Sequence, residues 1–148
     1  MWVTNFSGNS VTEFAANGAF VQTLSGGPYG FNNPRGIAFD GTHVWVTNNS
    51  ANSVTEFAAS TGAWIQTLSG SRYGFNQSFD VATDGTHLWV TNASGNTVTE
   101  VAASTGAWVQ TLSGGPYGFN APTGVAVEGG HVWVTDNGGN AVIEFATG

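Results

Sequence analysis

Residues 36–68, GIAFDGTHVWVTNNSANSVTEFAASTGAWIQTL, are the stretch that decides the fold. They contain four short strand-like segments joined by tight turns. Turn-forming groups such as Asp-Gly and Ser-Thr-Gly separate the segments, as expected for hairpins. Almost all the rest of the chain is a copy of this stretch.

One tryptophan marks each copy, within a segment of the HVWVTN type. These residues are Trp2, Trp45, Trp89 and Trp133. The spacings between them are 43, 44 and 44 residues. A period in the forties with four strands per unit is typical of the blades of a β-propeller. The sequence therefore predicts an all-β propeller of four-stranded antiparallel blades, of which this chain supplies about three and a half, or half a ring.

The predicted propeller is divided into four blades. They are an incomplete first blade at residues 1–24, a second at 36–68, a third at 80–112 and an incomplete last one at 123–148. The first lacks its inner strand and the last its outer strand, which leaves fourteen strands. Asn17-Gly18 predicts a two-residue type I′ hairpin, in which both residues have positive φ. Ser60-Thr61-Gly62 predicts a three-residue hairpin with a left-handed glycine.

The composition excludes several classes of partner. Charged residues make up 7% of the 148 residues, lysine is absent, and the formal net charge is −7. Such a surface repels phosphate backbones, and it lacks a basic face for membranes, so neither nucleic acid nor a membrane is expected as a partner. Without cysteine there are no disulfides or thiolate metal sites. No signal-peptide pattern precedes the repeats. The compartment is left open, with a preference for outside the cytoplasm.

The repeat resembles a known family. YGFNNPRGIAFD (29–40), followed by HVWVTNNSANSVTEF, is similar to the NHL repeat, and its VWVTN segment to YVTN-type propeller repeats. The resemblance implies a propeller, generally of six blades, or of seven in the related streptogramin lyases. NHL repeats often carry an arginine just before the third strand. Here that position holds Ser10, Ser53, Thr97 and Ala141, which removes the basic surface that RNA-binding members use.

Three histidines recur at one blade position, each three residues after an acid. They are His43, His87 and His131, after Asp40, Asp84 and Glu128. A ring of histidines could hold a metal or a proton-transfer pair. The simpler interpretation is a repeated hairpin in which the acid accepts hydrogen bonds from turn amides. Repetition favours the hairpin, because a catalytic site needs different residues in different roles. The resemblance to streptogramin lyases, which depend on a histidine and an acid, keeps the first interpretation open.

A glutamate recurs in the third strand of each blade, at Glu13, Glu56, Glu100 and Glu144. A carboxylate between blades must be hydrogen-bonded or solvated. Tryptophan indoles, threonine hydroxyls and asparagine amides of the adjoining strand are the expected partners, in a structural ladder.

Departures from the repeat are the candidate ligand-binding residues. Arg72 stands where the other copies have Pro28 and Pro116, and Asp80 where they have glycine. Arg35 aligns with Phe79 and Thr123. All lie in the connections into the inner strands, the face where propellers usually bind ligands. A tyrosine also recurs there and would supply an aromatic rim. The candidate ligand-binding residues are Tyr29, Arg35, Arg72, Tyr73, Asp80 and Tyr117; drift without selection explains the same substitutions.

Three functions follow. The first is a non-catalytic binding or scaffold module for a small molecule, glycan or peptide, without a cofactor. The second is a lyase of the streptogramin-lyase type, which needs a histidine, an acid and a divalent metal near the channel. The third is a repeat fragment with no ligand of its own.

An open arc would expose two apolar faces, each on the order of 500 Å², and covering each face would contribute about 12 kcal/mol. We therefore expect a homodimer that closes a ring of six to eight blades.

Two expectations concern positions within the fold. Trp45 and Trp89 should be buried between blades. The histidines and the variable connections should emerge at opposite ends of the sheets, with Tyr29, Tyr73 and Tyr117 away from the histidines.

Overall fold

The computed structural model describes residues 1–147, which form fourteen strands and one short 3₁₀ helix. The strands are β1 (Trp2–Asn5), β2 (Ser10–Phe14), β3 (Phe20–Ser25), β4 (Pro34–Phe39), β5 (His43–Asn48), β6 (Ser53–Ala58), β7 (Trp64–Leu68), β8 (Ser78–Thr83), β9 (His87–Asn92), β10 (Thr97–Ala102), β11 (Trp108–Leu112), β12 (Pro122–Glu128), β13 (His131–Asp136) and β14 (Ala141–Ala146). The helix is η1 (Gly27–Tyr29). No helix among these residues is long and apolar enough to cross a membrane.

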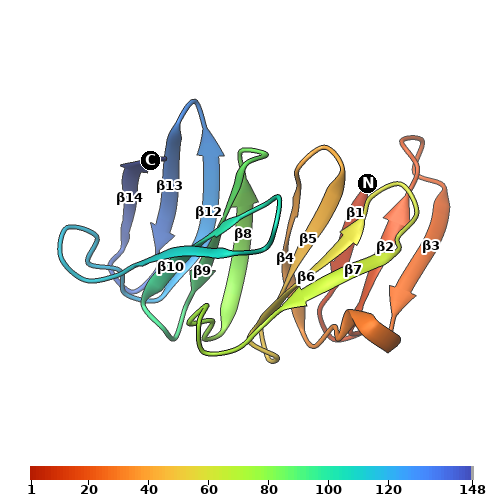
Figure 1. Ribbon diagram of the computed structural model, residues 1–148, viewed down its shortest axis with the longest axis horizontal. Coiled ribbons are helices and arrows are strands. Elements are labelled where there is room, and N and C mark those ends of the chain that lie inside the picture. The colour runs from red at the N-terminus through yellow and green to blue at the C-terminus, as the bar shows by residue number, and fades with distance from the viewer. Residues whose placement is uncertain (148) are drawn as a thin grey trace.

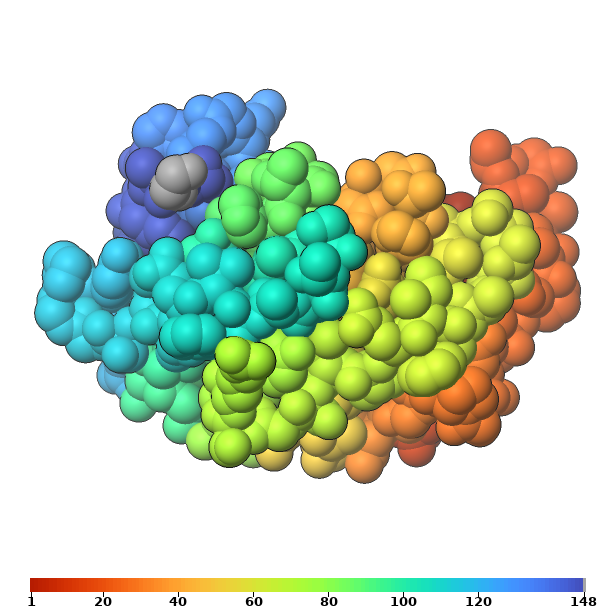
Figure 2. Space-filling model, in the orientation of Figure 1, coloured from red at the N-terminus to blue at the C-terminus, as the bar shows by residue number. Residues whose placement is uncertain are grey.

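The strands form four antiparallel sheets that follow one another around an arc (Figure 1). The sheets are β1–β3, β4–β7, β8–β11 and β12–β14, each a simple meander. The inner strands β4, β8 and β12 lie side by side. Figure 2 shows the sheets packed in sequence order from the N-terminal to the C-terminal end. The chain is therefore a partial β-propeller, as the sequence predicts.

Each inner strand begins one or two residues before the predicted start of its blade. The β4 strand starts at Pro34, but its pairing with β5 is interrupted between Pro34 and Ile37. There the Gly36 N–H donates to the Thr47 side-chain hydroxyl instead of a backbone carbonyl, at 2.8 Å. The same break separates Pro122 from Val125 in β12. A side chain thus replaces one rung of the ladder at the channel end of each inner strand.

Two hairpin predictions need correction. Gly18 has the expected positive φ of 82°, but Asn17 does not have positive φ, so the turn is not type I′. The Ala15 N–H donates to the Ala19 carbonyl, which makes a three-residue loop. In the second copy, the Ala58 N–H donates to the Ala63 carbonyl, so that loop has four residues. Gly62 is left-handed as predicted, with φ 73°. Both loops are one residue longer than expected because the strands are shifted by a bulge after Glu13 and Glu56.

The hydrophobic core lies between the sheets. Trp45 packs with Val81 and Leu88 of the following sheet, and Trp89 with Val132 and Val134 of the last one. Their exposed fractions are 0% and 1%, which confirms the predicted burial. Each sheet therefore completes the core of its neighbour, as in other repeat architectures.

Two polar contacts recur between consecutive sheets. A threonine of the second strand donates to a carbonyl of the next inner strand: Thr4 to Arg35, Thr47 to Phe79 and Thr91 to Thr123, at 2.7, 3.0 and 2.7 Å. An asparagine in the turn after that strand accepts the backbone N–H of the next connection: Asn9 from Asn33, Asn52 from Gln77 and Asn96 from Ala121, at 2.7 to 2.8 Å. We call this pair of contacts the inter-sheet clasp.

Candidate functional site

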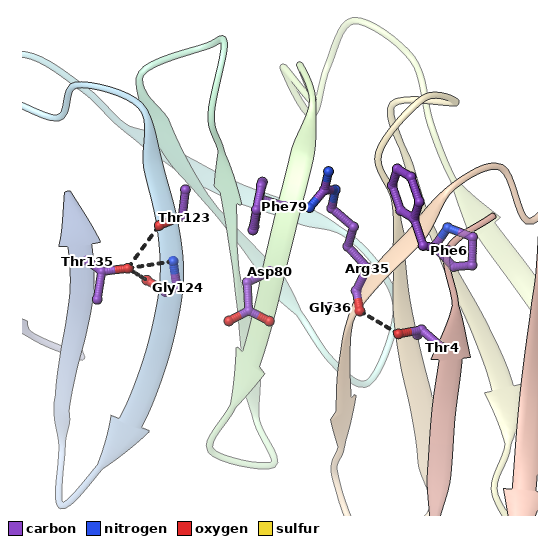
Figure 3. Close-up of a pocket in the computed structure, with 10 residues that line it drawn as sticks. Thr4, Phe6, Arg35, Gly36, Phe79, Asp80, Thr123, Gly124 and Thr135 are labelled. Atoms are coloured by element: carbon purple, nitrogen blue, oxygen red, sulfur yellow. Dashed lines mark hydrogen bonds between the residues drawn. The ribbon is translucent and has the colours of Figure 1, made fainter. Parts of the chain in front are cut away.

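A cavity of about 610 Å³ lies at the start of the inner strands (Figure 3). Its wall is formed by the first residues of β4, β8 and β12 and by the N-terminal sheet. The lining residues are Thr4, Phe6, Pro34, Arg35, Gly36, Phe79, Asp80, Thr123, Gly124 and Thr135. The break in pairing at Gly36 and its equivalents places these side chains at the channel.

Arg35 is held in this cavity by two aromatic rings. Its guanidinium carbon lies 4.5 Å from the ring centroid of Phe6 and 4.3 Å from that of Phe79. Figure 3 shows the side chain pointing between the two rings. Cations stack favourably on aromatic faces. Among residues 1–147, no carboxylate lies within 4 Å of this guanidinium, so its charge is available to a ligand.

Asp80 occupies the neighbouring inner-strand position and is largely enclosed. One carboxylate oxygen accepts the N–H of Val125 on β12 at 3.1 Å, and the other accepts the N–H of Val81 at 2.9 Å. Burial raises the pKa of Asp80 above its usual value, although these two hydrogen bonds oppose the rise. The backbone of Asp80 also packs against Gly36, where an added Cβ would come within 2.6 Å of the Asp80 Cα. Asp80 thus joins three inner strands at the cavity.

The structure brings two of the six candidate residues together. Arg35 and Asp80 both line the cavity, whereas Arg72 and the three tyrosines do not. Phe6 also lines it and was not among the candidates. A sequence signal was present, because Phe6 stands where the other copies have Asn49, Ala93 and Asn137.

The tyrosines lie between neighbouring sheets. Tyr29 is half-buried, stacks on Phe31 with centroids 5.2 Å apart, and donates its hydroxyl to the Gly62 carbonyl at 2.6 Å. Tyr73 makes the same bond to Gly106 at 2.8 Å. Gly62 lies in the hairpin at the end of the sheet that also carries the histidine. The expectation that the tyrosines face away from the histidines is therefore wrong for their side chains, because the rings extend back between the sheets.

Two of the three histidine hairpins, those of His43 and His87, are built as the structural interpretation predicts. Asp40 accepts the backbone N–H groups of Thr42 and His43 at 2.9 and 2.7 Å. Burial raises the pKa of Asp40, but hydrogen bonds from the Trp45 indole and these amides outweigh burial and lower it overall. In the next copy the Thr86 and His87 amides bind Asp84 in the same way. These hairpins lie at the opposite end of the sheets from the connections (Figure 1).

Each histidine approaches the glutamate of the third strand. His43 Nδ1 lies 3.5 Å from Glu56, His87 Nε2 lies 3.8 Å from Glu100, and His131 Nδ1 lies 2.8 Å from Glu144. None of these histidines lines the channel cavity. No group of three or more His, Asp or Glu side chains within residues 1–147 is arranged to hold a metal ion. Within the part of the chain that the structure describes, these histidines therefore approach acidic side chains without forming a set of three metal ligands.

The predicted partners of the third-strand glutamates need correction. A glutamine of the fourth strand, not a tryptophan, threonine or asparagine, donates to each of three carboxylates. The pairs are Gln22 with Glu13, Gln66 with Glu56 and Gln110 with Glu100, at 2.8, 2.6 and 2.6 Å. Burial raises the pKa of Glu56, and the Gln66 hydrogen bond opposes that rise. The ladder itself is present, and it runs outward across the sheet.

Comparison with solved structures shows the same fold. A catalytically inactive virginiamycin B lyase from Staphylococcus aureus, solved with quinupristin, superposes with a TM-score of 0.77 at 18% identity. A streptogramin B lyase gives 0.75 at 18% identity, and hydrazine synthase from Kuenenia stuttgartiensis gives 0.68 at 23%. The matches cover 99%, 98% and 87% of this chain, but only 51%, 50% and 36% of those chains. The chain thus spans about half the length of the lyases.

Sequence comparison identifies the repeat. Residues 119–145 match the NHL repeat family. A search of the curated proteins found no match. The matched segment runs from Phe119 through β12 and β13 into β14, and the earlier copies carry the same pattern. The chain is a partial β-propeller that contains an NHL repeat at residues 119–145.

Proposed function

We propose that this chain is a β-propeller binding module whose ligand site is the channel cavity at Arg35, Phe79 and Asp80. The proposal rests on the positions at which one copy of the repeat differs from the other copies. Arg35, Phe79 and Thr123 occupy one repeat position, and Asp80 replaces a glycine at the next. These departures line one cavity of about 610 Å³, a volume suited to a small ligand.

The chemistry of the cavity favours a small molecule with an anionic group and an apolar part, rather than a glycan or peptide. Arg35 offers a cation without an acidic partner in a chain of net charge −7. The planar guanidinium pairs with carboxylates or phosphates through two parallel hydrogen bonds. Phe6 and Phe79 supply apolar surface on either side of it.

Benzoate combines both features and is the probe for this site. In a titration followed by ¹H–¹⁵N spectra, we expect saturable shifts of the Arg35 side chain and of the Phe79 and Thr123 amides. Arg35→Ala should abolish them. Arg72→Ala is the matched control because Arg72 is the other basic residue and lies outside the cavity. Retained binding in Arg35→Ala would contradict the site, and absence of any shift would favour a fragment without a ligand.

We also propose that a second copy completes the ring. The arc has two uncovered end sheets, and large apolar side chains are exposed at both. Met1 is 70% exposed at one end and Val142 is 64% exposed at the other. Heterologous contacts between such ends close into a ring when the rotation is right, and two half rings meet that condition.

A metal-dependent lyase is the alternative function, because the fold is shared with virginiamycin B lyase. The geometry favours it less, since the histidine hairpins lie at the opposite end of the sheets from the cavity. The test is incubation of the chain with quinupristin and Mg²⁺, followed by mass spectrometry. We expect quinupristin to remain intact. Cleavage that is lost on changing one histidine alone would support the lyase instead.

A further inference from the structure

The N-terminal sheet has an open edge beside an apolar groove. In this three-stranded sheet β1 pairs with β2, and among residues 1–147 no strand pairs with its other edge. The groove along that edge has a volume of about 360 Å³. It is lined by Met1, Trp2, Ile37, Ala38, Phe39, Val44 and Ala59. Phe39 on its far wall is 59% exposed. An unpaired edge beside an apolar groove is suited to an added strand.

The other sheets show which kind of strand occupies the edge that is open at β1. An inner strand pairs with the second strand in one fixed register, in which Ile37 lies opposite Val46 and Val125 lies opposite Val134. Val3 is the repeat equivalent of Val46 and Val134. A strand of the same kind would therefore bring a valine opposite Val3 and cover Trp2.

We propose that β12 of a second copy fills this groove, so that the two chains exchange strands. This inference rests on the proposed completion of the ring by a second copy. The β13–β14 segment that pairs with β12 has a close copy in β1–β2 of the same chain. The partner's β1 would take the place of β13, with Val3 opposite Val125 and Trp2 opposite Ala126.

The exchanged contacts match the ones that they replace. Val132, Val134 and Phe145 pack on the third sheet, and their repeat equivalents are Met1, Val3 and Phe14. The incoming sheet also carries β3, which supplies the outer strand that β12–β14 lack. Because β1–β3 is already folded in its own chain, releasing β13–β14 regains the backbone entropy that ordering those two strands costs. Similar contacts at a lower entropy cost favour the exchange.

Closure without exchange leaves both ends incomplete. If β12–β14 docked side by side with the partner's first sheet, the groove at β1 would stay empty. The inter-sheet clasp would also lack its partner at this junction, because Thr135 and Asn140 would meet a sheet without a preceding connection. In the exchanged ring, every contact between neighbouring sheets is of the kind seen between β1–β3 and β4–β7 and between β4–β7 and β8–β11. Each chain then contributes three four-stranded blades, which gives a ring of six.

Hydrogen exchange on the native chain separates these arrangements. At micromolar concentration we expect a particle of twice the 15.3 kDa chain mass, in which residues 131–146 exchange as fast as an unfolded segment. Residues 43–58, their repeat equivalents, should stay protected. A dimer with residues 131–146 protected would overturn the strand exchange while leaving ring completion intact. A folded monomer would overturn both.

A pair of cysteine variants tests the register directly, because the chain has no native cysteine. Val3→Cys with Val125→Cys places the two thiols opposite each other across the exchanged junction. We expect mild oxidation to give a covalent dimer on a non-reducing gel. The matched variant, Val125→Cys with Val134→Cys, joins residues that are opposed within one unexchanged chain. Its thiols should stay free. The proposal would be contradicted if this variant oxidised rapidly within one chain and the variant with cysteines at positions 3 and 125 gave no covalent dimer.

Discussion

The two inner sheets and the two end sheets share one sequence pattern but not one environment. Trp45 and Trp89 are 0% and 1% exposed, whereas Trp2 and Trp133 are only half-buried. The side chains of Glu56 and Glu100 are 4% and 7% exposed, but that of Glu144 is 53% exposed. The same residue type is buried only where another sheet follows.

The difference shows that no blade has a core of its own. Trp2 lacks an inner strand to cover it, and Trp133 lacks a following sheet. In a repeat protein, stability is approximately a sum of terms within units and between neighbours. Within one chain, each end sheet lacks part of the packing that an inner sheet has with its neighbours. Substitutions at equivalent positions of inner and end sheets measure the free energy of that missing packing.

The largest difference is expected for the tryptophans. Trp89→Ala should lower the free energy of unfolding by about 3–5 kcal/mol, because it leaves a large cavity between sheets. Trp133→Ala removes a side chain that is already half exposed, so its loss should be clearly smaller. Urea denaturation of both variants measures the two losses. Equal losses would show that Trp133 is covered as fully as Trp89, as in a ring that closes without strand exchange.

The next effect concerns two glycines at the channel. A Cβ on Gly36 would lie 2.6 Å from the Asp80 Cα and carboxylate, whereas one on Gly124 would meet the Thr135 hydroxyl at 2.9 Å. Thr135 can turn away, but the Asp80 backbone cannot. Gly36→Ala should therefore cost about 1–3 kcal/mol, and Gly124→Ala less. Thermal denaturation followed by circular dichroism compares them, and a costlier Gly124→Ala would show that the inner strands are not held together at Asp80.

The inter-sheet clasp gives a smaller difference. Asn52 accepts the Gln77 N–H, whereas Asn140 has the same left-handed backbone at the end sheet, with no sheet following it. Glycine tolerates positive φ, so Asn→Gly is compatible with the backbone at both positions, and only at Asn52 does it also remove this hydrogen bond. We expect Asn52→Gly to cost about 1 kcal/mol more than Asn140→Gly in urea denaturation. If the free energy of unfolding falls equally in the two variants, the clasp contributes nothing to stability.

The smallest effect is a dependence on pH. Burial raises the pKa of Glu56, so the unfolded chain ionises at lower pH than the folded one. The stability that this group contributes is fully present below its unfolded pKa and is lost as pH rises through its folded pKa. Glu56→Gln should therefore gain stability relative to the unmodified chain as pH rises above the ordinary pKa of a glutamate. Glu144→Gln, at the exposed position, is the control, and an equal gain there would show that burial is not the cause.

Much of the fold was predictable because it depends on periodic features. The tryptophan spacing and turn glycines predicted the propeller, and the propeller in turn predicted that Trp45 and Trp89 are buried between blades. The loop lengths were missed because the bulges after Glu13 and Glu56 shift the strand register, which alternation alone does not reveal. The partners of the glutamates were predicted incorrectly for another reason: Gln66 lies directly opposite Glu56 in the regular part of the ladder, and it was not among the expected partners.

The candidate site was predictable only where the repeat changes. Arg35 and Asp80 stood out as departures from glycine, phenylalanine or threonine, and they share the cavity. Tyr29 and its equivalents lie in the same connections, but their rings point between sheets because their hydroxyls bind carbonyls such as that of Gly62. A connection's position along the chain does not give the direction of its side chains. The ligand-binding role of Arg35 and Asp80 stays a prediction.

The mass of the native chain in solution tests most directly whether a second copy completes the ring. Light scattering coupled to size exclusion, at micromolar protein, should give twice the 15.3 kDa of one chain, independent of further dilution within that range. A stable, folded particle of 15.3 kDa would contradict the account, because its two end sheets would then be stable without a neighbour.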